Sequence, residues 1–398
     1  MPAKKTFSPP VQASSSEQSE PKPSVSTRER LRRGLATALH ATGALRLVRK
    51  FEGTHQVLSS PPSRWPKVRR FHKSKFGILC YHRVGTEGVP LFSRLDPRVF
   101  EAQMKYIRKH YRIVPLGQMC AELTNDDVMR PTLAITFDDG YRDLYTHALP
   151  VLRKYAIPAT IYLIGRSMET GESPWYDRIF VALEHVAGNA IEVEMDAPRR
   201  FALTSVADRR QAAWEIVCFL RTVSDARRRA WCVEFETRMK PPQAELANRI
   251  LDWNQVRSMQ ASGISFGAHT MTHPSVARLA STDLEQELGA SRSLLESKLD
   301  APTVDFAYPF GKLSDCSLAA DSYLARSGYR SAVTTVEGIN SFGANSFRLN
   351  RMQISDDGSL SLFAFNLARM FFESISDNTV PTAARADMLS LEANRSAS

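Results

Sequence analysis

From Phe76 onward, short apolar segments alternate with helical patterns, and this alternation restricts the fold more than any other feature of the sequence. Strands are expected at 76–81, 111–116, 132–137, 157–164, 263–269, 304–308, 331–335 and 347–354. Helical patterns lie between several of them, at 97–110, 143–155, 282–299 and 318–327. Apolar strands that alternate with helices are typical of a parallel sheet covered on both faces. The sequence therefore predicts an α/β fold, either an open sheet of this kind or a (β/α) barrel.

Composition divides the chain into segments. The first is rich in Ser and Pro and is predicted to be disordered, because it has too few large apolar side chains to repay the entropy of ordering. Within the α/β domain, a helical and charge-rich stretch interrupts the alternation and is interpreted as an insertion. The expected organisation is a tail (1–27), a basic amphipathic arm and linker (28–75), the α/β domain (76–358) with its insertion at about 171–250, a C-terminal helix (359–377) and a disordered tail (378–398).

The net charge of +10 belongs to the N-terminal part of the chain. Residues 1–75 contain 16 Lys and Arg against 4 Asp and Glu, and the remainder contains 36 against 38. A nearly neutral folded domain argues against the basic face that nucleic-acid binding requires. The arm is different, because leucines on one helical face at 28–50 are surrounded by arginines. It either contacts an anionic membrane surface or packs on its own domain.

The N-terminal residues, the lengths of the apolar runs and the cysteines give expectations about the cellular compartment. The first residues have basic charge but no apolar core after it, so no signal peptide is predicted, and no apolar run is long enough to span a bilayer. The five cysteines form no Cys-x-x-Cys pair, which favours a reducing compartment. The expectation is a cytoplasmic protein, peripheral at the inner face of the membrane.

Two adjacent carboxylates, Asp138 and Asp139, follow the apolar segment 132–137, and Gly140 turns the chain after them. The carboxyl ends of strands form the active-site face in (β/α) folds. A turn aims neighbouring side chains differently, so one carboxylate can bind a cation while the other accepts a proton. The alternative is an ordinary Asp-Gly turn that begins the next helix.

Two histidines four residues apart, His269 and His273, follow another apolar segment. This spacing allows both imidazoles to reach one divalent ion. Two imidazoles and one carboxylate leave positions open for water and substrate, as a catalytic metal site requires. Zinc suits such ligands, and cobalt or nickel would also fit.

The segments TFDDGY, HTMTH and FAYPFG, each behind a strand and in this order, resemble the signature of the NodB-homology polysaccharide deacetylases, carbohydrate esterase family four. The resemblance spans about Phe76 to Ile354. The segments ILCYHRVG and YTHALPVLRKYAIPATIYLIG resemble a circularly permuted branch associated with bacterial exopolysaccharide synthesis. The fold implied is the irregular (β/α) barrel of this family, with a divalent metal, zinc, as cofactor and an acetylated glycan as substrate.

The resemblance also implies roles for individual residues. Asp138 corresponds to the general base, and Asp139, His269 and His273 correspond to the metal ligands. The backbone N–H of Phe310 corresponds to an oxyanion-binding group. No histidine follows His273, so the general acid is assigned to His82, which matches the first strand of the permuted branch. The substrate-binding residues expected are Tyr141, Tyr308, Pro309 and Trp175.

One position departs from the family pattern. Where the family often has an arginine that orients the base, this chain has Ala307. Arg351, in the last expected strand, is the candidate to supply that charge.

Three functions remain open at this point. The leading hypothesis is removal of acetyl groups from N-acetylated hexosamines of a bacterial polysaccharide or its lipid-linked precursor. The same pocket would also suit an O-acetyl ester or a chitin-type or peptidoglycan oligosaccharide, with selectivity coming from insertion residues such as Trp175, Tyr176 and Asp177. The third hypothesis is a catalytically silent glycan-binding module.

Overall fold

The computed structural model describes residues 75–86, 94–124, 130–247, 249–354 and 359–376. The predicted disordered tails and the basic arm lie outside the described residues. Within the described part of the chain, no helix has the length and apolar character needed to cross a membrane.

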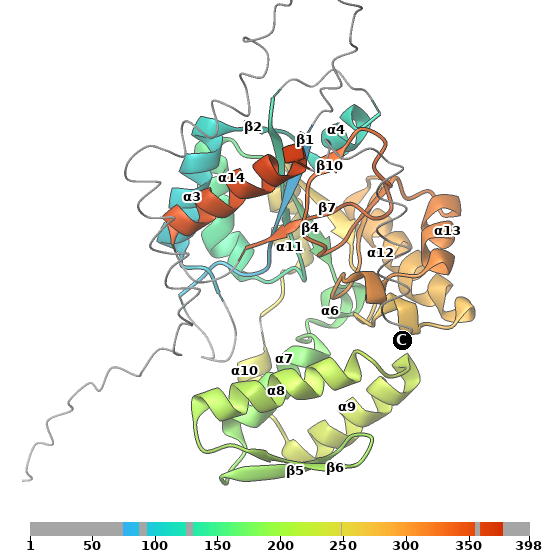
Figure 1. Ribbon diagram of the computed structural model, residues 1–398. Coiled ribbons are helices and arrows are strands. Elements are labelled where there is room, and N and C mark those ends of the chain that lie inside the picture. Colours follow the sequence, from blue (N-terminus) through green and yellow to red (C-terminus); the bar gives the residue numbers. More distant parts are fainter. Residues whose placement is uncertain (1–74, 87–93, 125–129, 248, 355–358, 377–398) are drawn as a thin grey trace, which may run out of the picture.

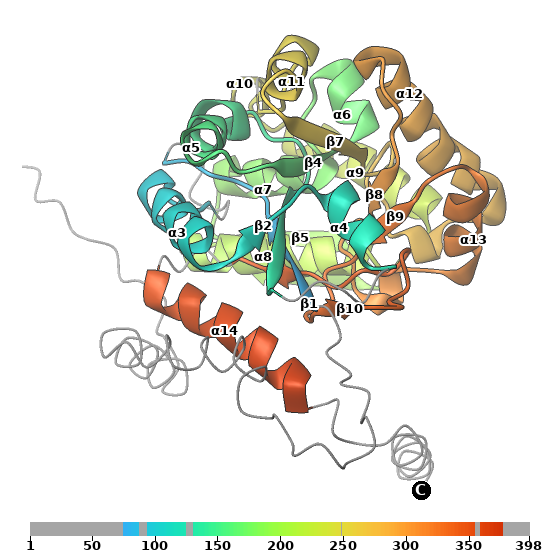
Figure 2. The same ribbon diagram turned by 90° about the horizontal axis from the view of Figure 1, so that it is seen from above.

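A curled, mainly parallel sheet forms the centre of the molecule (Figures 1 and 2). In the described residues its strand order is β10-β1-β3-β4-β7-β8-β9, with β2 paired to β3 and β11 paired to β1. β10 is antiparallel to β1, and the other pairings of this sheet are parallel. The strands are β1 (Lys75–Tyr81), β2 (Arg112–Ile113), β3 (Thr132–Phe137), β4 (Ala159–Leu163), β7 (Ile264–Ala268), β8 (Asp305–Ala307), β9 (Ser331–Val333), β10 (Asn340–Ser341) and β11 (Met352–Gln353).

The segment that ends in β11 links the two edges of this sheet. Leu349 pairs with Val333 of β9, and Met352 pairs with Leu79 of β1 a few residues later. The last described strand therefore closes the curled sheet into an irregular barrel. Arg351 lies in this closing segment, between the two pairings.

The long strands are apolar on both faces. Helices cover the face that points out of the barrel, and the face that points inward packs against side chains of the other strands. Leu79 of β1 and Ile135 of β3 belong to the outer core beneath the helices. Ile78 and Ala134, one residue earlier in each strand, belong to an inner cluster that also contains residues of α4. This alternation is the two-residue period of a strand, and it makes the barrel interior a packed core. The interior is tight: a Cβ on Gly267 of β7 would lie 2.6 Å from the Tyr162 ring.

Helices surround the barrel and connect its strands (Figure 2). Asp96 caps the first described helix by accepting hydrogen bonds from the N–H groups of Arg98 and Val99. The helices of the barrel are α3 (Pro97–His110), α4 (Leu116–Glu122), α5 (Leu149–Tyr155), α6 (Gly165–Thr170), α11 (Trp253–Gln260), α12 (Ala290–Leu299), α13 (Leu318–Arg326) and α14 (Leu360–Ser376). A π-helical turn precedes α5 (Leu144–Ala148), and another precedes α12 (Glu285–Gly289).

A separate lobe lies beside the barrel, drawn below it in Figure 1. It has its own apolar core, which includes Ile179, Ile216 and Phe235. Its elements are α7 (Trp175–His185), β5 (Ala190–Glu194), β6 (Pro198–Ala202), α8 (Val206–Leu220), α9 (Asp225–Met239) and α10 (Gln243–Leu246). We refer to Trp175–Leu246 as the lobe.

The predicted α/β barrel is confirmed, and several local expectations need correction. The strand expected at 347–354 is only Met352–Gln353, because residues before it bridge to β9 instead of extending one ladder. The stretch interpreted as helical, 171–250, also contains the antiparallel pair β5 and β6. The helix expected at 282–299 begins with a 3₁₀ turn and a π-helical turn before it becomes α12.

Candidate active site

The candidate residues meet because neighbouring strands place inward-facing positions at the same end of the barrel. Cys80 of β1 is paired with Thr136 of β3. His82 follows Cys80 by two residues and Asp138 follows Thr136 by two, so both side chains also face inward. On the other side of the barrel, Ala268 of β7 pairs with Phe306 of β8. His269 follows directly, and its Nδ1 lies 2.7 Å from the carbonyl oxygen of Ala307.

Strained backbone is concentrated at this end of the barrel. Asp139, His273 and Phe310 have positive φ angles of 74°, 57° and 59°. A side chain disfavours this conformation, which costs of order 1–3 kcal/mol for each residue and persists only where the surrounding structure enforces it. The three residues share the end of the barrel at which the strands deliver the candidate carboxylates and histidines, which points to a functional reason for the strain.

Asp139, His269 and His273 form a compact group of possible metal ligands. The Nε2 atoms of both histidines lie 3.6 Å from Oδ1 of Asp139. Ligands about 2.1 Å from a tetrahedral zinc ion are about 3.4 Å from each other, so the spacing suits one ion among the three atoms. The contact of His269 Nδ1 with the Ala307 carbonyl leaves Nε2 facing the group, which is the usual arrangement of a metal-binding histidine.

The electrostatics of the three groups also fit a cation. Burial lowers the pKa of His269 to about 4 and that of His273 well below its usual value, so both imidazoles are neutral, as ligands must be. Burial, reinforced by the charge of Asp138, raises the pKa of Asp139 well above its usual range. A divalent ion between these groups would compensate the buried carboxylate. The residues present therefore fit a metal of the zinc type.

Asp138 is held quite differently from its neighbour. Its two carboxylate oxygens accept hydrogen bonds of 2.7 Å from Nη1 and Nη2 of Arg351, whose side chain is fully buried. Arg351 also donates to the Thr334 carbonyl and to the Thr136 hydroxyl. Burial alone would raise the pKa of Asp138, but the guanidinium outweighs it and keeps that pKa below its usual range. Asp138 is thus fixed in orientation and charged.

Two further side chains approach Asp138 from β1 and the residues after it. The Cys80 thiol donates to Oδ2 at 3.5 Å, and Nε2 of His82 lies 3.9 Å from the same oxygen. Cys80, His82 and Asp138 have the donor atoms of a second possible metal group, but the guanidinium of Arg351 on Asp138 disfavours a cation there. The His82 side chain is 42% exposed, so it can reach a substrate. Sequence reasoning missed Cys80, which carried no signal beyond its place in β1.

Phe310 closes the site on the side of β8. Its ring packs edge-on against His273, with centroids 4.9 Å apart, and the Arg221 guanidinium lies 5.2 Å from the ring centroid. Its carbonyl oxygen accepts a hydrogen bond from the Thr335 hydroxyl at 2.6 Å. Among the described residues, the Phe310 N–H donates to no other group. That donor is therefore left without a partner among these residues.

The lobe supports the loop that carries the two histidines. Nε1 of Trp175 donates to the His273 carbonyl at 3.1 Å, and Arg228 donates to the Thr272 hydroxyl at 3.1 Å. From the barrel side, Glu287 accepts hydrogen bonds from the N–H groups of Met271 and Thr272. Trp175 is buried, so its position suits alignment of the metal ligands better than contact with substrate.

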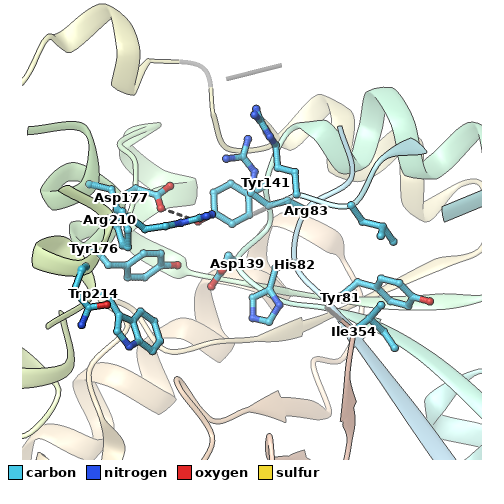
Figure 3. A pocket seen from close by; sticks show the side chains of 14 residues that line it. Tyr81, His82, Arg83, Asp139, Tyr141, Tyr176, Asp177, Arg210, Trp214 and Ile354 are labelled. Carbon is cyan, nitrogen blue, oxygen red and sulfur yellow. Dashed lines mark hydrogen bonds between the residues drawn. The ribbon is translucent and has the colours of Figure 1, made fainter. Parts of the chain in front are cut away.

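A pocket of about 470 Å³ opens beside Asp139 and His82, between the barrel and the lobe (Figure 3). Tyr141, expected to bind substrate, lines it, and its hydroxyl donates to Asp177 at 3.0 Å. Tyr176 lines it too, with its hydroxyl directed towards Asp139. The volume lies in the range of roughly 300–1,000 Å³ that is typical of small-molecule sites.

Two other residues expected to bind substrate have different positions. The Tyr308 side chain is fully buried, and its hydroxyl donates to Asp321 at 2.6 Å. Pro309 is also buried, and its carbonyl accepts a hydrogen bond from the Gly311 N–H. Neither residue lines the pocket. The side chains follow the strand alternation, which turns Tyr308 towards the outer core.

Comparison with known proteins identifies the family. The family model described as "Polysaccharide deacetylase" matches residues 125–330, which include both aspartates, both histidines and Phe310. The chain belongs to the polysaccharide deacetylase family. Members of this family are metal-dependent hydrolases, which agrees with the group formed by Asp139, His269 and His273.

Two curated relatives have sequence similarity to the chain. "Putative polysaccharide deacetylase YxkH" of Bacillus subtilis is 24% identical over 312 residues, covering 77% of this chain and 81% of the relative. "Poly-beta-1,6-N-acetyl-D-glucosamine N-deacetylase" of Staphylococcus epidermidis is 27% identical over 113 residues, covering 25% of this chain and 39% of the relative. Among solved structures, the Streptococcus pyogenes deacetylase PplD in complex with acetate has a TM-score of 0.51 at 22% identity, covering 75% of this chain and 99% of PplD.

We expect the protein to bind one zinc ion, and His269→Ala to weaken that binding at least tenfold, because it removes one of three protein ligands. The measurement is zinc content after dialysis against a weak chelator, with titration calorimetry of the zinc-free protein. His185→Ala is the matched control, since this histidine is exposed at the end of α7. Equal zinc affinity in wild type and His269→Ala would refute the assignment of the ligands.

Proposed function

We propose that this protein removes acetyl groups from N-acetylated hexosamine units of a bacterial polysaccharide or of its lipid-linked precursor. The observation that carries the proposal is the different environment of two adjacent carboxylates. Asp138 is charged and fixed by Arg351, and Asp139 faces two neutral imidazoles at ligand distance. Hydrolysis of an amide needs both functions, a base that removes a proton from water and a group that holds a cation beside the carbonyl.

The chain's own residues supply the remaining steps. A zinc ion held by Asp139, His269 and His273 would polarise the acetamide carbonyl and lower the pKa of water in the site. Asp138 removes a proton from the attacking water, and Arg351 keeps its oxygens oriented towards that water. The Phe310 N–H hydrogen-bonds to the developing oxyanion. His82, beside Asp138 and open to the pocket, protonates the leaving amine.

The substrate class is supported by the relatives and by the pocket. One relative's name specifies N-deacetylation of poly-β-1,6-N-acetyl-D-glucosamine, although the similarity covers only a quarter of this chain. The pocket next to Asp139 is large enough for a sugar rather than for acetate alone. These two observations favour an acetylated aminosugar. An O-acetyl ester or a chitin-type oligosaccharide would use the same residues, and the acetate-release assay below separates them.

The alternative of a catalytically silent module has less support. A glycan-binding module needs a pocket, but it does not need a buried arginine that fixes both oxygens of a carboxylate, or an N–H donor without a partner beside a metal-ligand group. The geometry around Asp138 and Phe310 is therefore better explained by catalysis.

We expect Asp138→Asn to abolish acetate release while zinc content stays at the wild-type level, because the amide cannot accept the proton and Asp138 is not a metal ligand. Acetate is measured enzymatically after separate incubations with β-1,6-linked N-acetylglucosamine oligomers, with the β-1,4-linked oligomers of chitin, and with O-acetylated xylan. His82→Gln should lower kcat by about 10²–10⁴-fold, the usual contribution of a general acid. Wild-type rates in Asp138→Asn, or no acetate from any substrate with zinc-loaded wild type, would contradict the proposed function.

We also propose that residues 28–50 contact an anionic membrane surface. This proposal rests on the sequence alone. Deletion of residues 1–50 should reduce co-sedimentation with vesicles that contain phosphatidylglycerol, because the deletion removes most of the arm's cationic charge. Acetate release from soluble oligomers should not change. Equal sedimentation of the full and truncated chains would refute the membrane contact.

A further inference from the structure

The wall of the pocket formed by the lobe contains features that the proposed reaction does not use. Trp214 of α8 lines the pocket, and 56% of it is exposed. Arg210 stands one helical turn before it, on the same face of the helix, and also lines the pocket. The opposite face of α8 contributes Ala212, Ile216 and Leu220 to the core of the lobe. Folding of the lobe therefore does not require Trp214 to be a tryptophan.

A buried acceptor lies on the same wall. Asp177 is 1% exposed, and its Oδ1 accepts the hydrogen bond from Tyr141. Its Oδ2 is also buried, and within the described residues it has no hydrogen-bond partner. Buried carboxylate oxygens without a partner are rare and call for a specific explanation. Asp177, Arg210 and Trp214 lie along the side of the pocket across from His82, and Tyr176 is seen between Asp177 and Trp214 (Figure 3).

These three side chains match the chemistry of one uncharged sugar ring. A pyranose has an apolar face of C–H groups, which suits an exposed indole. It has hydroxyl groups, which donate to a carboxylate, and ring and hydroxyl oxygens, which accept from a guanidinium. An anionic ligand fits less well, because the unpartnered oxygen of Asp177 would repel it. A purely apolar ligand would leave that oxygen without a partner.

We propose that Trp214, Arg210 and Asp177 form a subsite for a second sugar, adjacent to the acetylated unit at Asp139. The pocket is continuous from Asp139 and His82 to Trp214, so one glycan chain can occupy both positions. The inference rests on the proposed function and extends it: the substrate is an oligosaccharide or polysaccharide of at least two units, and the lobe selects it. Trp214 stacks on the second ring, Asp177 accepts a hydrogen bond from one of its hydroxyl groups, and Arg210 donates a hydrogen bond to one of its oxygens.

The test measures binding without turnover. Full-length, zinc-loaded Asp138→Asn protein is titrated with N-acetylglucosamine and with its β-1,4- and β-1,6-linked tetramers. Adding Trp214→Ala should weaken binding of at least one tetramer by about tenfold, the usual effect of removing an aromatic anchor, and leave the monosaccharide affinity unchanged. Trp214→Phe should recover part of the loss. Val233→Ala is the matched control, because Val233 is 68% exposed on the same lobe but does not line the pocket.

The outcomes separate the subsite from the catalytic proposal. Undiminished tetramer binding in Trp214→Ala, an equal loss for monosaccharide and tetramer, or no tetramer binding at all would overturn the subsite. If tetramer binding depends on Trp214 but wild-type protein releases no acetate, the subsite stands and the proposed function fails. If the wild type releases acetate and Trp214→Ala leaves KM for the tetramers unchanged, the proposed function stands and the subsite fails.

Discussion

The buried pair of Arg351 and Asp138 is the interaction on which the architecture of the site depends. Arg351 lies between the pairings of Leu349 to β9 and of Met352 to β1, so the same short segment closes the barrel and delivers the guanidinium. Its side chain binds β3 through the Thr136 hydroxyl and the end of β9 through the Thr334 carbonyl. Loss of one partner from a buried ion pair typically lowers the free energy of unfolding by about 3–5 kcal/mol. Closure of the barrel and ionisation of Asp138 therefore stabilise each other.

This coupling explains how two adjacent carboxylates acquire different properties. Asp139 has a positive φ, so the chain reverses its direction immediately after Asp138. One carboxylate then faces the guanidinium and the other faces the two imidazoles. Without a cation, burial and Asp138 keep the pKa of Asp139 raised, whereas Arg351 keeps that of Asp138 lowered. The difference comes from the strand register and the turn, since both residues belong to the same short segment.

The sequence predicted the parts of the structure that have local signals. Strand alternation predicted an α/β fold, and the resemblance of the motifs to the deacetylase family implied the barrel. TFDDGY and HTMTH contain the residues that meet at its end. Arg351 was only a candidate, because it is 213 positions from Asp138 and contacts it only when the barrel closes. Tyr308 was expected in the pocket, but side chains alternate in direction along a strand, and its hydroxyl donates to Asp321 outside the pocket. Trp214 and Arg210 were not identified, because their spacing on α8 is ordinary for a helix and only the packing of the lobe against the barrel brings them to the pocket.

The most direct test of this account separates the role of Arg351 from metal binding and folding. Acetate release by Arg351→Gln and Arg351→Lys is compared with wild type, together with zinc content and the thermal midpoint of unfolding. If Arg351 orients Asp138, Arg351→Gln loses about 10²-fold or more in kcat with KM and zinc content unchanged, and Arg351→Lys recovers part of the loss. Wild-type kcat in a folded, zinc-loaded Arg351→Gln protein would contradict the account.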